Sequence, residues 1–509
     1  MSTSLYSVTA LPPARRRGEL RLPFGLETSP IAFVLLALAL IVAAGAGAAF
    51  RPVVGIGVVA AVALALAIVL RPYFGVFLIV GLAPITSGLA RGMPVPGVRI
   101  SELLMSAVPF LLLATVQRSE PLRWTRFDWA ALAYVVASVV LGIANLTRRG
   151  APLTGTDLGT MLGPLQFFLA YRATATLCRT PERRRWALRL VLLASIPVSV
   201  LAILQALGPQ LFRTFVANIT GLDYLDVPAG GSFRATGPFP AWHNLGGYEL
   251  IVILIAAGCL MRPVEGVLSR RLLYVVLGLG ALATIQTASI APIVMTVVCV
   301  AALAVALRRF GRFAVTATVV AAAAAVLFAP LAQGRLDQEF SQPVGGARSA
   351  YVPESINHRY ELWTQREVPI LHGRWLMGYG PDQPPEMASF PYSESQYFSF
   401  LLHGGMVLLA AYLVLMAAMW GMGREASRDR DPLLRMLGRV TVLVVFALLV
   451  LNFIEGYFVG SGTAHLTWLL VAVIAGAQAR VTRRVPEPYE ERVQHLRVPR
   501  PQPGIHVGG

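Results

Sequence analysis

The sequence contains no lysine, few acidic residues and very little cysteine. Its 43 basic residues are all arginine, and charged residues make up only 14% of the 509 positions. With 56% hydrophobic residues and a mean hydropathy of +0.65, the composition excludes a soluble chain of this length. The cysteines, Cys178, Cys259 and Cys299, are odd in number and lack metal-ligand spacing, so they predict small core residues.

The chain also lacks an internal repeat, a Gly-rich phosphate loop and a nucleotide-binding motif. What it has is a series of about fourteen apolar stretches, most of them near the roughly 20 residues that cross a hydrocarbon core. Backbone groups in lipid must be satisfied within the segment, so these stretches predict an all-α, polytopic transmembrane bundle of about 12–14 spans. The predicted spans are 31–50, 53–70, 73–90, 101–116, 128–146, 157–177, 187–207, 244–260, 272–287, 289–307, 313–332, 398–420, 438–455 and 462–478.

The spans divide the chain into three regions. Residues 1–30 form a basic tail, residues 31–480 form the membrane domain, and the Pro-rich residues 481–509 have the composition of a disordered tail. Two of the connections between spans are long, at 210–243 and 333–397. Long connections without strong periodicity are usually functional.

Most arginines fall in the short connections on one side of the predicted membrane, which indicates that this side is cytoplasmic. Both termini are then cytoplasmic, and both long connections face outward from a bacterial cytoplasmic membrane. Arg148 and Arg149 are exceptions to the rule. The net charge of +17 follows from this bias and from contact with anionic lipid, so we expect no nucleic-acid partner.

Arginine on the outward side is scarce, yet the second long connection keeps five. A planar guanidinium binds phosphate oxygens in a bidentate manner, and without lysine it is the only strong cation in the chain. The five are Arg335, Arg348, Arg359, Arg366 and Arg374.

Both long connections carry motifs of a known family. Residues 233–248 read Phe-Arg-Ala-Thr-Gly-Pro-Phe-Pro-Ala-Trp-His-Asn-Leu-Gly-Gly-Tyr, and the second connection contains Arg359-Tyr-Glu-Leu-Trp363, Pro369 and Gly378-Tyr-Gly380. Glu394-Ser-Gln-Tyr397 follows, with Leu401 and Gly405 entering the next span. These residues resemble the O-antigen ligase and O-antigen polymerase superfamily, in its Arg-x-x-Gly-x-Phe and Arg-x-x-x-Trp motifs, its Gly-x-Gly and its large outer loop before the last spans.

The chain departs from that family at two positions. Glu394 stands where ligases carry a histidine, and Ile290 follows Ser289 where many relatives have arginine. Because lipopolysaccharide ligases depend on that histidine, the first departure favours a polysaccharide polymerase over a ligase.

The resemblance implies metal-independent glycosyl transfer without a cofactor, outside the cytoplasm, from a polyprenyl-diphosphate-linked saccharide to a glycan or lipid acceptor. Membrane lipids and other polysaccharide-assembly membrane proteins are the implied partners. Guanidinium groups would stabilise the charge of the leaving diphosphate, and a carboxylate would take the proton of the incoming hydroxyl. The catalytic residues expected on this basis are Glu394, Arg234 and Arg359. The residues expected to bind substrate are Arg234, Arg359, His243, Asn244, Trp363, Arg374 and Tyr397.

Each of these residues also has a structural interpretation. The arginines are suited to surface salt bridges, and Glu394, His243 and Asn244 lie where helix caps are expected. Ionisable groups inside spans are costly and often functional, but they are also found paired or reaching toward water. This applies to Glu249, Glu455 and His465.

Two other classes of function stay open at this stage. A lipid-linked saccharide flippase or exporter would place ionisable groups or broken helices at mid-membrane, and Pro197 and Pro292 are candidates for such breaks. A non-catalytic polysaccharide-assembly protein would keep the fold without the ligase histidine.

Overall fold

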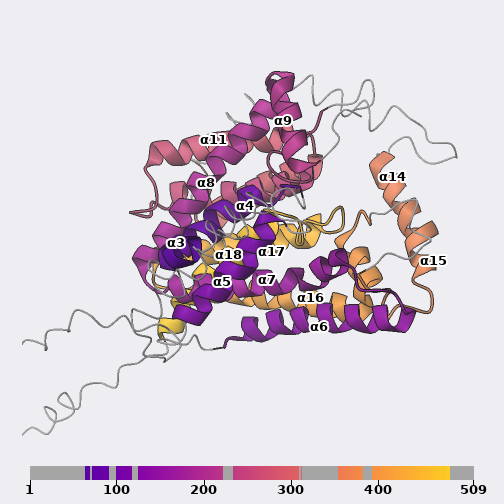
Figure 1. Cartoon of the computed structure of the whole chain (residues 1–509). Helices are drawn as coiled ribbons and strands as arrows, with labels where there is room; N and C mark the ends of the chain where they lie inside the picture. The colour runs from indigo at the N-terminus through magenta and orange to yellow at the C-terminus, as the bar shows by residue number, and fades with distance from the viewer. Residues whose placement is uncertain are drawn as a thin grey trace, which may run out of the picture.

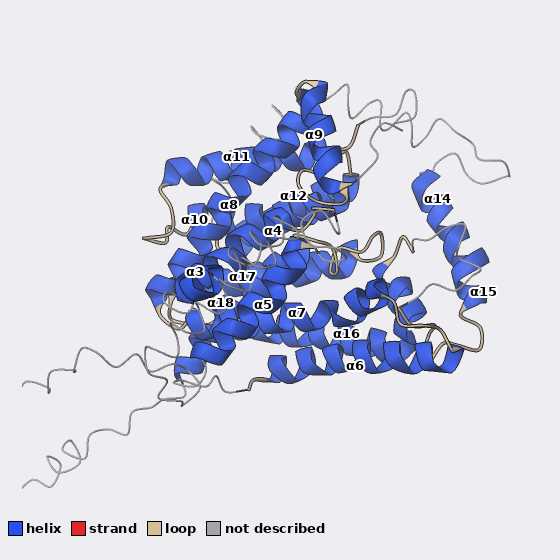
Figure 2. Cartoon of the chain, viewed as in Figure 1, coloured by secondary structure: helices blue, strands red, loops and turns tan. Residues whose placement is uncertain are grey.

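The computed structural model describes residues 63–68, 72–90, 99–116, 124–221, 233–308, 311, 354–381 and 393–481. The secondary structure in these ranges is helical throughout, as Figures 1 and 2 show. The predicted tails 1–30 and 481–509, apart from residue 481, lie outside the described residues. So do the spans predicted at 31–50 and 313–332 and most of the one at 53–70.

The helices follow one another with short connections. The first group is α3 (Pro72–Phe77), the π-helical η1 (Leu78–Leu82), α4 (Ala83–Thr86), α5 (Ile100–Val116), α6 (Arg126–Arg149), α7 (Gly155–Leu177), α8 (Pro181–Leu207) and α9 (Gln210–Thr220). The second group is α10 (Trp242–Met261), α11 (Arg270–Gln286), α12 (Ile290–Ala306), α14 (Glu354–Glu361), the π-helical η3 (Leu362–Glu367), α15 (Val368–Ile370), α16 (Gln396–Ala426), α17 (Pro432–Leu451) and α18 (Thr463–Val481).

Five helices are long and apolar enough to cross a membrane: α6, α8, α10, α16 and α17. Shorter apolar helices lie at Pro72–Thr86, Ile100–Leu113, Ile290–Ala306 and Thr463–Gln478. The prediction of an all-helical, multi-pass membrane protein is therefore confirmed at this level. The count of about 12–14 spans stays a prediction.

Helix α10 forms the centre of the bundle, with α11 and α12 on either side of it. Nearly all of its residues are buried. Glycines allow the close packing: a Cβ at Gly246 would lie 2.8 Å from Pro292 of α12, and one at Gly258 would lie 2.6 Å from Met436 of α17. Small residues at such contacts let helix backbones approach each other in lipid, where no hydrophobic effect drives the helices together.

Helix α16 is broken at Gly405, whose φ of 62° and ψ of −159° are open to glycine but not to residues with a Cβ. The break releases two carbonyls and two N–H groups, and residues 375–380 satisfy all four. Tyr379 and Gly380 donate to Leu402 O and His403 O, at 2.6 and 2.9 Å. Met406 N–H and Val407 N–H donate to the carbonyls of residues 375 and 376. The Gly-x-Gly motif and Gly405 thus form one joint, and irregular backbone is tolerated there because it is buried in protein.

The two long connections are not irregular throughout, which differs from the sequence prediction. The first begins with α9, an amphipathic helix that ends at Gly221 with φ 68°. The second contains α14, η3 and α15, which stand at the same end of the bundle as α9 in Figure 1. The sequence pattern missed these helices because each is short and lacks the long apolar run of a span.

Ion pairs fix the opposite end of the bundle. Arg172 of α7 lies 2.8 Å from Asp128, which also forms a capping box with Thr125 at the start of α6. Arg184 of α8 lies 3.2 Å from Asp431 at the start of α17. Two arginines on the side predicted to be cytoplasmic therefore hold helix ends together.

Candidate functional site

A cluster of charged side chains joins the start of α16 to the turn between α17 and α18. Arg359 Nε on α14 lies 3.0 Å from Glu394 Oε2, and Arg359 Nη2 lies 3.8 Å from Glu455 Oε1. His358 Nε2 lies 3.8 Å from the other oxygen of Glu394. The guanidinium also donates to the carbonyls of Ile454 and Ser355. One predicted arginine and the predicted base are thus brought into direct contact.

The first long connection reaches the same cluster through α10. His243 Nδ1 lies 3.8 Å from Glu455 Oε2, and the His243 ring packs edge-on against Tyr457 and Trp242. The Arg234 guanidinium lies 4.5 Å from the centroid of the Trp242 ring. A continuous series of contacts therefore links Arg234 to Glu394, so residues from both long connections share one site at one end of the bundle.

Two carboxyl groups of this region are buried. Burial raises the pKa of Glu455 to about 7; Glu394 acts in the same direction and Arg359 in the opposite one. Burial likewise raises the pKa of Glu367 on η3 to about 7, with Ser393 lowering it and Glu394 raising it. Groups that change protonation near neutral pH are suited to proton transfer.

Arg234 and Arg374 are cations of a different kind. Within the described part of the chain, no carboxylate lies within 4 Å of either guanidinium. Arg234 lies over Trp242, and Arg374 lies 4.8 Å from the centroid of the Tyr379 ring. Their charge is not neutralised by a described carboxylate, whereas an anion that reaches Arg359 competes with Glu394.

The remaining predicted residues have mixed surroundings. Trp363 stacks on Phe398 at 5.6 Å between ring centroids. The Tyr397 hydroxyl donates to Leu449 O at 2.6 Å, which gives this residue a place in packing α16 against α17. The Asn244 carbonyl accepts a hydrogen bond from Thr463 of α18.

The helix-cap interpretations do not describe this site. The residues before α10 and α16, Ala241 and Ser395, make no side-chain cap hydrogen bond. Glu394 instead contacts Arg359 and His358, while His243 and Asn244 lie within the first turn of α10.

Several buried polar atoms of the site have no hydrogen-bond partner among the described residues. They include His243 Nδ1, Asn244 Oδ1, Gln396 Oε1, Trp363 Nε1 and Arg374 Nη1. Buried polar groups are normally paired, so such a group of unpaired atoms is typical of a ligand site. Sequence reasoning did not find Gln396 or Glu367, because nothing local distinguishes them from other polar residues at helix ends.

No protein-family model matches the chain, and no curated protein matches it significantly. The resemblance noted in the sequence therefore rests on the motif residues themselves.

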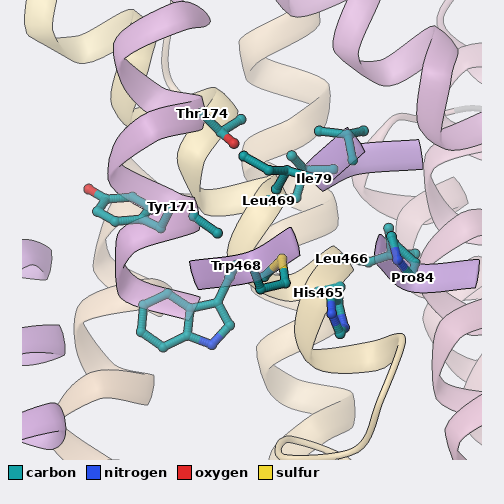
Figure 3. Close-up of a pocket in the computed structure, with 11 residues that line it drawn as sticks. Ile79, Pro84, Tyr171, Thr174, His465, Leu466, Trp468 and Leu469 are labelled. Atoms are coloured by element: carbon teal, nitrogen blue, oxygen red, sulfur yellow. The ribbon is translucent and has the colours of Figure 1, made fainter. Parts of the chain in front are cut away.

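Two other features lie apart from the cluster. A small pocket in the bundle interior, shown in Figure 3, is lined mainly by apolar side chains together with Tyr171, Thr174 and His465. His465 Nδ1 accepts the Gly462 N–H at 3.1 Å, which gives this histidine a structural role. Glu249 is fully buried in α10 and contacts the Ser199 hydroxyl at 2.7 Å.

Proposed function

We propose that the chain is a metal-independent glycosyltransferase of the bacterial cytoplasmic membrane. It transfers saccharide from a polyprenyl-diphosphate donor to a glycan or lipid acceptor outside the cytoplasm, and it serves cell-surface polysaccharide biosynthesis as a polymerase or ligase. The observation that carries this proposal is the contact series from Arg234 to Glu394. It gathers cations, carboxylates and aromatic rings from both motif-bearing segments.

The charge distribution supports a division of labour within the site. Arg234 and Arg374 have no described carboxylate partner, so they bind the diphosphate of the donor, and Arg359 stabilises the charge that develops as the anomeric bond breaks. The carboxylates on the other side of Arg359 receive the proton of the acceptor hydroxyl. Trp363 and Trp242 offer rings against which a sugar can pack.

A transfer assay with a labelled lipid-linked oligosaccharide tests this function on the purified protein. Arg234→Ala is expected to lower turnover by about 10²- to 10³-fold. Arg234→Lys is expected to restore little of it, because an ammonium group lacks the planar fork. Arg428→Ala, an exposed arginine after α16 at the opposite end of the bundle, is the matched control and is expected to keep wild-type turnover. Full activity of Arg234→Ala would exclude the assigned role.

A lipid-linked saccharide flippase is the second candidate, favoured by the break in α16 at Gly405 and by the buried Glu249 in α10. Broken helices and buried ionisable groups are common in transporters. In sealed vesicles a flippase moves the lipid-linked saccharide without changing its length, whereas a transferase yields a longer or transferred glycan. A non-catalytic assembly protein would do neither.

A further inference from the structure

The turn between α17 and α18 is held by one buried side chain. Asn452 Oδ1 accepts the N–H groups of Tyr457 and Phe458, both at 3.1 Å. Asn452 Nδ2 lies 2.6 Å from the Tyr412 hydroxyl of α16. Glu455 lies within this fixed turn, so its carboxylate is presented on a preorganised scaffold rather than on a flexible loop.

Unpaired polar atoms from two helices converge on the same turn. A Cβ at Gly456 would lie 3.1 Å from Gln396 Oε1 of α16, and one at Gly460 would overlap Asn244 Oδ1 of α10. The side chains of Asn244 and Gln396 are buried, and neither oxygen has a hydrogen-bond partner in the described chain. Uncharged acceptors of this kind match hydroxyl donors, of which a sugar has several.

The two carboxylates beside Arg359 are held differently. Glu394 is bonded to the guanidinium at 3.0 Å, which keeps its charge neutralised. Glu455 lies 3.8 Å from both Arg359 and His243. An oxygen placed beside the His243–Glu455 contact can reach both side chains at about 2.8 Å, the usual hydrogen-bond distance.

From this geometry we infer that the Glu455 turn is the acceptor subsite and that Glu455, rather than Glu394, takes the proton of the attacking hydroxyl. The inference rests on the proposed transferase function. In the step, the acceptor oxygen forms a bond to the anomeric carbon while the bond from that carbon to the donor phosphate breaks. The electron pair leaves with the polyprenyl diphosphate, and the hydroxyl proton passes to Glu455.

The groups that face Glu455 determine how its activity depends on pH. They are Arg359 from α14, Glu394 before α16, His243 from α10 and Tyr457 in the same turn. Glu455 acts as a base only when ionised, and its pKa is about 7. The single-turnover rate should therefore rise as pH increases through about 7 and level off above it.

The experiment compares single-turnover rates of wild type, Glu455→Gln and Glu394→Gln across this pH range. Glu455→Gln is expected to lose at least about 10² in rate and to lose the rise near pH 7, while still binding the lipid-linked donor. Glu394→Gln is expected to keep the rise. Glu425→Gln, whose carboxylate contacts Gln478 at the other end of the bundle, is the matched control.

The acceptor amides provide a second readout. Asn244→Ala and Gln396→Ala are each expected to raise the acceptor KM about fivefold, the loss of one hydrogen bond, with little change in donor binding. A pH profile that is unchanged in Glu455→Gln, or amide variants that lower the melting temperature but leave the acceptor KM unaltered, would overturn the inference. Absence of transfer by the wild type itself would instead reject the proposed function, so the two failures are distinguishable.

Discussion

Arg359 Nε lies 3.0 Å from Glu394 Oε2, although the two residues stand on opposite sides of the η3–α15 segment. The sequence suggested separate roles for them, the arginine at the leaving group and the glutamate as a base. Because they form an ion pair, each sets the charge of the other. Their functional effects should therefore be coupled.

A double-mutant cycle tests this coupling. Arg359→Ala is expected to lower transfer by at least about 10²-fold. Adding Glu394→Gln to it should cost much less than the product of the two single effects, with a coupling of about 0.5–3 kcal/mol. Turnover measured for both single variants and the double variant gives this value. Independent, multiplying effects would mean that the ion pair has no catalytic consequence.

Gly405 should be far more sensitive to substitution than another glycine of the same helix. A Cβ at Gly405 would overlap the carbonyl of Leu376 in a backbone conformation that favours glycine, whereas a Cβ at Gly421 meets no neighbour within 4 Å. Gly405→Ala should lower the melting temperature and lose transfer activity, because Arg374 and the Gly378–Gly380 turn are attached to the break. Gly421→Ala should be neutral or stabilise by up to about 1 kcal/mol. Equal melting temperatures for the two variants would contradict the assigned joint.

Glu367 should make the fold less stable at alkaline pH. Its carboxyl titrates near 7 in the folded protein against an ordinary value of 4.5, so the folded state holds the extra proton between these values. Stability then falls as pH rises from 4.5 through about 7 and remains lower above that. Glu367→Gln should raise the melting temperature at pH 8, by an amount equivalent to at most about 3 kcal/mol, and change it little at pH 4.5. A melting temperature that shifts equally at both pH values would contradict this account.

The orientation in the membrane can be tested with introduced cysteines, because the native cysteines are buried. Tyr360 lies on α14 beside the site, and Arg430 lies beyond the other end of α16, and both are exposed. A membrane-impermeant thiol reagent added to intact cells should label Tyr360→Cys. It should label Arg430→Cys only after permeabilisation. The reverse pattern would place the site in the cytoplasm and remove the proposed donor from its reach.

Composition and periodicity alone determined that this chain is a multi-pass helical membrane protein, because a long apolar run in lipid must satisfy its own backbone. The sequence also singled out Arg359, Glu394, Gly378–Gly380 and Gly405, since charged residues and paired glycines stand out where most positions are apolar. The contacts among these residues were decided by the tertiary structure. No local pattern could have shown that Glu394 pairs with Arg359, or that the Gly-x-Gly turn completes the hydrogen bonds of a broken helix, because both depend on segments that meet only after folding.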